Sequence, residues 1–176
     1  MKVAAVQLTS TGNVTENQEL ALAKIREAAG NGARLIVLPE ATAQNFRSGR
    51  LDEQAQTLEG PFATAIQTLA EELEVTVVAG MFCPADTVER DGKTINRVTN
   101  TALIAGPGVL GGYDKIHTYD AFDYHESDTV LAGESLVAFD VDDLVVGVAT
   151  CYDIRFPEQF KELASQGAQL IVVPTS

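Results

Sequence analysis

Short apolar runs alternate with amphipathic segments along the first part of the chain. The runs at residues 2–8 and 34–39 are rich in Val, Ile and Leu, which is typical of buried strands. The intervening segment 15–32 carries apolar residues at helical spacing, and Thr15 and Gln18 have the spacing of a capping box at its start. The pattern therefore predicts a strand, a helix and a second strand.

The same alternation continues in the middle of the chain. Pro61 can begin a second amphipathic helix, and an apolar strand is predicted at 75–82. The polar segment 85–94 is typical of a turn or loop. The runs 95–106 and 108–117 are separated by a Gly-Pro-Gly sequence, which predicts a hairpin of two strands.

The last part of the chain contains a long irregular stretch before the alternation resumes. Residues 114–135 have no sustained period and are dense in Asp, Tyr and His, so they are interpreted as a long functional loop with at most a turn of helix. A strand is predicted at 143–150, a helix after Pro157 and a final strand at 168–174.

The sequence contains one internal repeat. "GARLIVLPE" begins at Gly32 and "GAQLIVVPT" begins at Gly167, each after an amphipathic helix. Two copies of one helix-strand unit indicate a sheet structure built by duplication. The chain stops at Ser176, directly after a strand that should be central, so we expect further chain or a partner surface beyond that point.

Length and charge exclude several classes of protein. We interpret residues 1–176 as a single domain that is incomplete at its C-terminus. The 12 Lys and Arg against 25 Asp and Glu give a net charge of −13, which repels nucleic acid and anionic membrane surfaces. The first apolar run meets polar residues by position 9 and is too short for a signal peptide, so we expect a cytoplasmic protein.

Three possible functional motifs have simpler explanations. "GPGVLG" at 106–111 matches GxGxxG, but a strand rather than a helix follows it, so a hairpin turn is favoured over a dinucleotide site. His117 and His125 lack the spacing of a helical metal pair. Cys83 has no charged neighbour and is interpreted as a small buried filler. Neither a cofactor nor a metal is predicted.

Cys151 differs because it lies at a predicted junction between a strand and a helix. Ligands gather at the carboxyl ends of strands in such folds, and amides at the start of a helix would favour the reactive thiolate. From position alone, a buried structural thiol and a nucleophile have about equal support, because free Cys is often buried. The charges of Asp153, Arg155 and Glu158 are expected to form pairs or cap the next helix.

Two charged residues also follow predicted strands. Glu40 comes after an apolar run and a proline, where poor solvation makes a carboxylate a better proton acceptor. Lys115 ends another strand, and an ammonium near a thiol would lower the thiol pKa and could donate to an oxyanion. The alternatives are a solvated acid and a solvated lysine, the commoner fate of each. Together with Cys151, they supply a base, a cation and a nucleophile.

The motifs around these three residues resemble those of one family. "LIVLPEA" around Glu40, "YDKIH" around Lys115 and "CYDIRFPE" around Cys151 occur in the order and approximate spacing of the nitrilase, or carbon-nitrogen hydrolase, superfamily. The resemblance extends over nearly the whole chain, although members usually continue well beyond its length. It implies an α/β fold, a four-layer α-β-β-α sandwich with helices outside two sheets.

The resemblance also implies a role for each residue. Glu40 would be the general base, Lys115 the oxyanion stabiliser and Cys151 the nucleophile that forms a thioester. The backbone N–H of Tyr152 would be a second oxyanion donor. Glu126 would orient Lys115 or the attacking groups, and the alternative for Glu126 is a solvated loop residue.

The residues after the thiol favour an amide substrate. Family members that hydrolyse nitriles resemble Cys-Trp-Glu at this point, whereas "CYDIRFPE" is similar to amidases of small omega-amides or deaminated glutathione. We therefore expect a small-molecule amide as the partner, no cofactor, and a homo-oligomer. A nitrile hydrolase and a catalytically inactive binding or regulatory member of the same fold are the alternatives.

Overall fold

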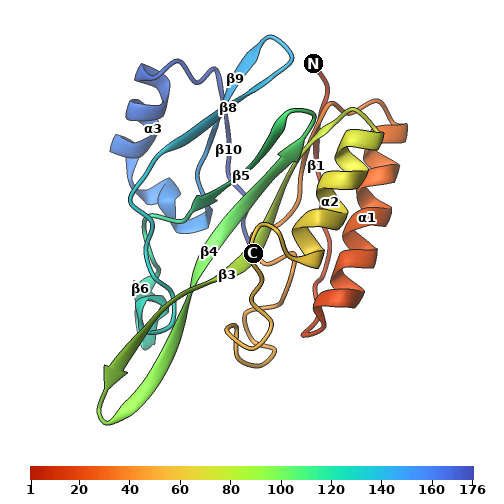
Figure 1. Cartoon of the computed structure of the whole chain (residues 1–176). Coiled ribbons are helices and arrows are strands. Elements are labelled where there is room, and N and C mark those ends of the chain that lie inside the picture. Colours follow the sequence, from red (N-terminus) through yellow and green to blue (C-terminus); the bar gives the residue numbers. More distant parts are fainter.

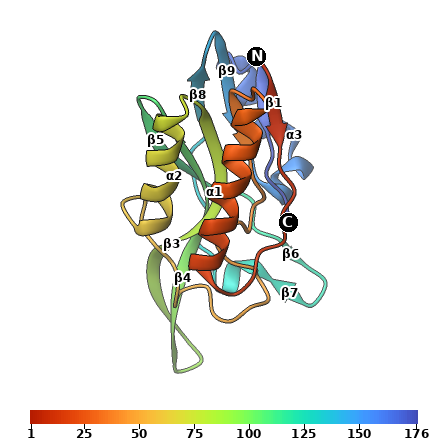
Figure 2. The same cartoon turned by 90° about the vertical axis from the view of Figure 1, so that its right-hand side faces the viewer.

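The protein is built from four layers in the order helices, sheet, sheet, helix. The structure, a computed structural model, describes residues 1–176. The first sheet contains, in spatial order, β1 (Val3–Ala5), β2 (Leu35–Val37), β3 (Thr76–Arg90), β4 (Lys93–Gly106) and β5 (Val109–Asp114). The second contains β10 (Leu170–Val172), β9 (Leu144–Val148) and β8 (Val137–Val141). The outer layers are α1 (Val14–Gly30) with α2 (Pro61–Glu72) on one side and α3 (Pro157–Ser165) on the other (Figure 1, Figure 2).

The strand directions place two loops at the carboxyl ends of parallel strands. In the first sheet β1, β2 and β3 are parallel, whereas β4 and β5 are antiparallel to their neighbours. In the second sheet β9 is parallel to β10 and antiparallel to β8. Binding sites in helix-and-sheet folds form outside the carboxyl ends of parallel strands. The loops after β2 and β9 leave their sheets at such ends.

Two apolar layers hold the four structural layers together. Between the helices and the first sheet, Ile25 of α1 and Phe62 and Ile66 of α2 are fully buried. Between the sheets, Tyr113 of β5 and Val146 of β9 are fully buried in a second cluster. Burial of each large apolar side chain contributes roughly 1.5–3 kcal/mol. The packing of two sheets between helices confirms the four-layer fold class.

Most of the predicted elements are confirmed, and the irregular stretch has little regular structure. The three helices lie in the predicted segments, and β4 and β5 form the predicted hairpin. Residues 114–135 contain only β6 (Asp120–Ala121), β7 (Tyr124–His125) and the short 3-10 helix η1 (Glu126–Asp128) outside the end of β5.

Two strands differ from the prediction. β3 continues through the polar segment to Arg90, and its second half pairs with the start of β4 in an arm that projects from the sheet (Figure 1). The side chains of this arm are mostly exposed, so no apolar alternation marks it. Residues Val137–Val141 form β8, which was not predicted as a strand.

The start of α1 also corrects the prediction. Asn13 is the residue before the helix, and its side-chain oxygen accepts hydrogen bonds from the amides of Thr15 and Glu16 at 3.0 and 3.3 Å. These bonds satisfy two amides that lack partners within the helix. The predicted capping box of Thr15 and Gln18 is therefore wrong, because the helix begins before Thr15.

The two copies of the repeated sequence end close to one another. They form β2 and β10, one in each sheet. The amide of Glu40 donates to the carbonyl of Thr175 at 3.4 Å, and the amide of Cys151 donates to the carbonyl of Pro174 at 2.9 Å. The end of the second copy thus lies between Glu40 and Cys151 and brings both into one region.

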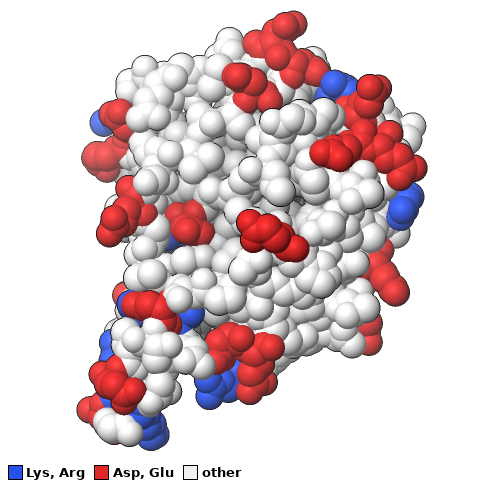
Figure 3. Space-filling view, viewed as in Figure 1, with Lys and Arg blue, Asp and Glu red and all other residues white.

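Acidic side chains outnumber basic ones at the surface, as the face in Figure 3 shows. In the projecting arm, Arg97 pairs with Asp86, and Arg90 pairs with Asp128 of η1. Exposed ion pairs of this kind contribute about 0–1 kcal/mol each. No helix in the structure combines the length and the hydrophobicity that crossing a membrane requires.

Candidate active site

Four of the residues singled out in the sequence lie at the ends of four different elements. Glu40 follows β2, Lys115 follows β5, Glu126 begins η1, and Cys151 begins the 3-10 helix η2 (Cys151–Arg155) after β9. Glu40, Lys115 and Glu126 are 1%, 2% and 2% exposed, and Cys151 is half-buried. Buried charges require partners, so the contacts among these side chains decide what the site can do.

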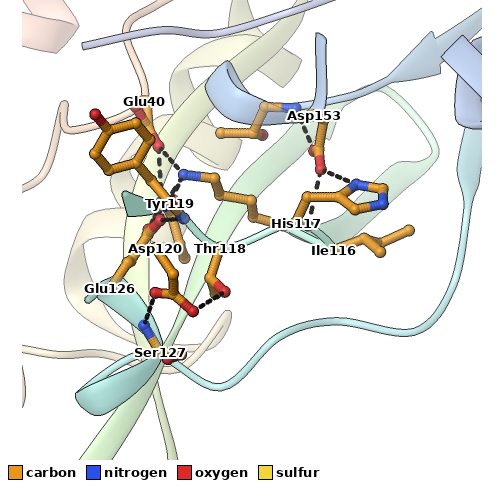
Figure 4. Close-up of polar contacts among 12 residues, drawn as sticks. Glu40, Ile116, His117, Thr118, Tyr119, Asp120, Glu126, Ser127 and Asp153 are labelled. Atoms are coloured by element: carbon orange, nitrogen blue, oxygen red, sulfur yellow. Dashed lines mark hydrogen bonds and ion pairs between the residues drawn. The ribbon is translucent and has the colours of Figure 1, made fainter. Parts of the chain in front are cut away.

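The three charged residues form a buried cluster in which one lysine contacts two carboxylates. Nζ of Lys115 lies 3.0 Å from Oε1 of Glu40 and 3.2 and 2.9 Å from Oε1 and Oε2 of Glu126 (Figure 4). The backbone N–H of Tyr119 donates to Oε2 of Glu126 at 2.6 Å. Glu126 is therefore not a solvated loop residue, and it shares the ammonium of Lys115 with Glu40.

Asn100 belongs to the same cluster, although no motif or spacing in the sequence marks it. Its Nδ2 donates to Oε1 of Glu40 at 2.8 Å and to Oε1 of Glu126 at 3.2 Å, and the residue is 1% exposed. A neutral donor between two carboxylates stabilises both without adding charge. The one sequence feature that could have indicated Asn100 is its polar side chain next to the apolar half of the predicted strand 95–106.

The carboxylate of Glu40 has one oxygen free for a further partner. The hydrogen bonds from Lys115 and Asn100 both reach Oε1, so neither of these two donors occupies Oε2. The thiol of Cys151 lies close enough to Glu40 for the carboxylate charge to act on it. This arrangement leaves Oε2 available as a proton acceptor.

The backbone of Cys151 adopts a conformation that side chains disfavour. Its φ is 47°, in the left-handed region, and the residue is not glycine. Such a conformation costs on the order of 1–3 kcal/mol and persists only where the surroundings fix it. The hydrogen bond of 2.9 Å from its amide to Pro174 is one such constraint. Strained residues of this kind are concentrated at functional sites.

The thiol of Cys151 is protonated at neutral pH. Burial, followed by the negative charge of Glu40, raises its pKa to about 11, although Lys115 acts in the opposite direction. The charge of Lys115 lowers the thiol pKa as expected, but burial and the carboxylate of Glu40 outweigh this effect. Any attack by this sulfur requires a base that removes the proton, and Glu40 is the carboxylate within reach.

The ammonium of Lys115 is stabilised by its partners. Burial by itself would lower the pKa of Lys115, but the charges of Glu40 and Glu126 together raise it above its ordinary value of 10.5. The side chain therefore keeps its positive charge over the whole physiological pH range. A fixed buried cation can stabilise negative charge that develops on a substrate oxygen.

Tyr152 directly follows the thiol and lies in a row of aromatic side chains. Its ring centroid is 5.0 Å from that of Tyr119 and 5.7 Å from that of Phe156, with interplanar angles of 86° and 76°. Edge-to-face pairs contribute about 0.5–1.5 kcal/mol beyond their buried area. The ring thus helps to fix η2, and the role of the Tyr152 amide as an oxyanion donor stays a prediction.

The remaining residues considered for chemistry lie outside the charged cluster. Cys83 is half-buried on β3, and burial raises the pKa of its thiol. His117 contacts Asp153, whereas His125 is exposed on β7. The structure contains no group of three or more His, Cys, Asp or Glu side chains arranged to hold a metal ion.

Gly80 of β3 allows the segment that carries Glu40 to pass directly over the strand. A Cβ at this position would lie 1.6 Å from the carbonyl oxygen of Glu40 and 2.6 Å from its Cα. Gly80→Ala is therefore expected to displace Glu40 and to lower the free energy of unfolding by about 1–3 kcal/mol or more, measured by urea denaturation.

Gly111→Ala is the matched control for this substitution. Gly111 is a strand glycine of β5, and an added Cβ there meets no atom within 4 Å. Its replacement should leave the urea midpoint unchanged or slightly higher, since alanine has less conformational freedom in the unfolded chain. Equal midpoints for the two alanine variants would contradict the proposed close approach of Glu40 to β3.

The fold defines a class of protein: two sheets packed face to face between helices form the sandwich of the nitrilase type. The nitrilase-superfamily amidase of Nesterenkonia has a solved structure that superposes on this chain with a TM-score of 0.81. It is 22% identical, and the match covers 99% of this chain and 64% of that protein, a likeness that shows the fold. Residues 2–176 match the family model described as carbon-nitrogen hydrolase, and the chain belongs to that family.

Two relatives from sequence comparison agree with this assignment. A hydrolase of Mycobacterium tuberculosis is 44% identical over 181 aligned residues, and a deaminated glutathione amidase of Synechocystis is 36% identical over 181. The matches cover 100% and 98% of this chain. The chain spans 61% and 65% of the length of these two relatives.

Proposed function

We propose that the protein is a cysteine-dependent amidase that hydrolyses small amides through a thioester on Cys151. The observation that carries the proposal is the buried contact between Glu40 and Lys115 beside the half-buried thiol. Membership of the carbon-nitrogen hydrolase family supports it. Relatives named deaminated glutathione amidase and omega-amidase favour a small omega-amide or a deaminated glutathione as substrate.

In the first half of the reaction, the sulfur of Cys151 forms a bond to the amide carbonyl carbon while its proton passes to Glu40. The carbonyl electrons move to the oxygen, and Lys115 and the amide of Tyr152 bind the resulting oxyanion. When this intermediate collapses, the C–N bond breaks and the proton on Glu40 passes to the leaving nitrogen. Ammonia departs, and the acyl group remains on the sulfur.

In the second half, water replaces the amine. Glu40 takes a proton from the water while the water oxygen bonds to the thioester carbon. Lys115 and the amide of Tyr152 bind the new oxyanion. The C–S bond then breaks, the sulfur regains its proton from Glu40, and the acid is released. One water is consumed, and Glu126 keeps Lys115 in place throughout.

The protonated state of the thiol agrees with this sequence of steps. A pKa of about 11 means that almost no thiolate is present at pH 7 before substrate binds. Proton transfer to Glu40 must therefore accompany the attack, which requires the carboxylate to lie beside the sulfur. The proximity of the Glu40 carboxylate, which contributes to the raised pKa of the thiol, supports this requirement.

The proposal is tested by two measurements on a panel of small primary amides that includes omega-amides and deaminated glutathione. Ammonia should appear in a one-to-one ratio with the acid product. Acid quenching during turnover, followed by peptide mass spectrometry, should find the acyl group on the peptide that contains Cys151. If neither ammonia nor an adduct forms with any amide, the protein is not an amidase.

The same panel distinguishes the alternative functions. Nitriles of matched carbon skeleton are included, and faster turnover of the nitriles would favour a nitrile hydrolase over an amidase. A binding or regulatory member of the fold would give no adduct with any amide or nitrile. For an amidase, each amide should be turned over faster than its matched nitrile, in agreement with the Tyr-Asp sequence after the thiol.

A further inference from the structure

We propose that Asp153 is a positioning residue that fixes the turn of Cys151 against the strand end of Lys115, an inference that rests on the proposed function. Asp153 lies two residues after the thiol in η2, and its side chain is fully buried. The sequence suggested only a pair or a helix cap for it. A carboxylate without solvent must be compensated by donors, so each of its contacts is informative.

Four donors surround the Asp153 carboxylate. Oδ2 accepts from the amide of Thr150 at 2.8 Å and from the hydroxyl of Tyr113 at 2.6 Å. Oδ1 accepts from the amide of His117 at 2.9 Å and lies 2.8 Å from Nδ1 of the same residue, as Figure 4 shows. Hydrogen bonds to a charged acceptor are stronger than those between neutral groups, so these contacts hold the carboxylate firmly.

These donors come from the segments that carry the two proposed reacting groups. Tyr113 lies two residues before Lys115, and His117 lies two residues after it. Thr150 immediately precedes Cys151. The Asp153 carboxylate therefore connects the segment that carries Lys115, at the end of β5, with the turn that carries Cys151.

Side chains of the following segment hold this bridge in place. Nε2 of Gln159 in α3 donates to the hydroxyl of Tyr113 at 2.8 Å. The ring of His117 stacks on that of Phe156, with a centroid distance of 3.6 Å and an interplanar angle of 7°. These contacts fix the donors to Asp153. The donors in turn hold the Asp153 carboxylate, and with it η2, in one position.

The positive φ of Cys151 explains why such a bridge is needed. A residue held at 47° relaxes towards other conformations unless its neighbours prevent it. The hydrogen bond from the amide of Thr150 to Asp153 fixes the peptide unit that enters Thr150, the residue directly before the thiol. A displacement of about 1 Å between reacting groups can lower a rate by about 10². Loss of the bridge should therefore reduce catalysis by a similar factor.

Asp153→Asn is a sharp test because neither orientation of an amide fits the four donors. If its NH₂ group faces Thr150, it meets that residue's backbone N–H. If it faces His117 instead, it meets the backbone N–H there. One donor must be displaced in either case, although the side chain keeps its size.

The expected result is a fall in kcat of about 10² with a KM within a few-fold of wild type. Both are measured for ammonia release at a temperature where circular dichroism shows the variant folded. Asp143→Asn, in the exposed turn between β8 and β9, is the matched control and should keep the wild-type kcat. A kcat for Asp153→Asn equal to that of the control, per folded molecule, would overturn the proposal.

A second measurement does not depend on turnover. The rate of alkylation of Cys151 by iodoacetamide is followed against pH, in a Cys83→Ala background so that one thiol reacts. With Asp153 in place the apparent pKa should lie near 11, because burial and the charge of Glu40 raise it. In Asp153→Asn it should fall towards 9.0, since the thiol moves away from both influences.

These measurements test the amidase function and the role of Asp153 separately. They also allow for the case in which the Asp153→Asn variant does not fold. If wild type releases no ammonia, the proposed function fails, while the alkylation profiles still test the role of Asp153. If Asp153→Asn is unfolded, Tyr113→Phe removes one of the four donors and should shift kcat and the thiol pKa in the same directions by smaller amounts. Unchanged profiles in the folded variant would mean that Asp153 is only structural.

Discussion

Replacing Cys151 by alanine is expected to abolish ammonia release from every amide that wild type hydrolyses. Cys151 is the proposed nucleophile, and loss of a catalytic nucleophile can cost on the order of 10⁶ in kcat. Stability should change little, because alanine keeps the backbone hydrogen bond from residue 151 to Pro174 and does not disturb the one from Thr150 to Asp153. The measurements are a coupled ammonia assay and urea unfolding of the same preparations.

Cys83→Ala is the control for this substitution. Both thiols are half-buried, and burial raises the pKa of each, but Cys83 lies on β3 outside the charged cluster. Its removal should leave the kcat for ammonia release near the wild-type value. Undiminished ammonia release by Cys151→Ala would remove the basis of the cysteine mechanism.

Lys115→Met is expected to damage both catalysis and stability. Methionine fills a similar volume without a charge, so two buried carboxylates lose their shared cation. Breaking a buried ion pair by removing one partner costs about 3–5 kcal/mol. The loss of an oxyanion donor lowers kcat by about 10²–10³. Urea unfolding at pH 7 and ammonia release measure the two effects.

The pH dependence of stability identifies the origin of this loss. The pKa of Lys115 is raised in the folded protein, so its contribution is complete below its unfolded pKa of about 10.5 and is lost as pH rises through the folded pKa. Wild type should therefore lose stability in strong alkali, and the difference from Lys115→Met should shrink there. Lys161→Met, on the exposed side of α3, should match wild type at every pH. A Lys115→Met protein as stable as Lys161→Met at pH 7 would contradict the buried ion pair.

The apolar elements of the fold could be predicted because burial imposes a regular spacing on them. β2 and β10 are short runs of branched residues, and α2 has one apolar face, so period and composition identify each. The outer half of β3 could not be found in this way. It forms a two-stranded arm with both faces in water, and its pairing with β4 depends on backbone hydrogen bonds that leave no hydrophobic pattern.

The candidate site divides in a similar way. Glu40, Lys115 and Cys151 stand out in the sequence because each follows an apolar strand, and strand ends are common sites of chemistry. Asn100 and Asp153 do not stand out, because their importance comes from partners on other strands. The raised thiol pKa was also missed, since the depth of burial and the distance to Glu40 exist only in the folded molecule.

The buried cluster joins residues that are far apart along the chain. The contact between Glu40 and Lys115 spans 75 positions, and that between Glu40 and Asn100 spans 60. Contacts between residues so far apart in the sequence require the closure of long loops. They therefore form more slowly than local helices. Glu40, Asn100 and Lys115 all belong to the first sheet or to segments directly after its strands, so their contacts form when β2, β3, β4 and β5 pair. Cys151 follows β9 of the second sheet, so the thiol joins this cluster only when the two sheets dock. The proposed activity would therefore appear with sheet docking, after the helices and the individual sheets have formed.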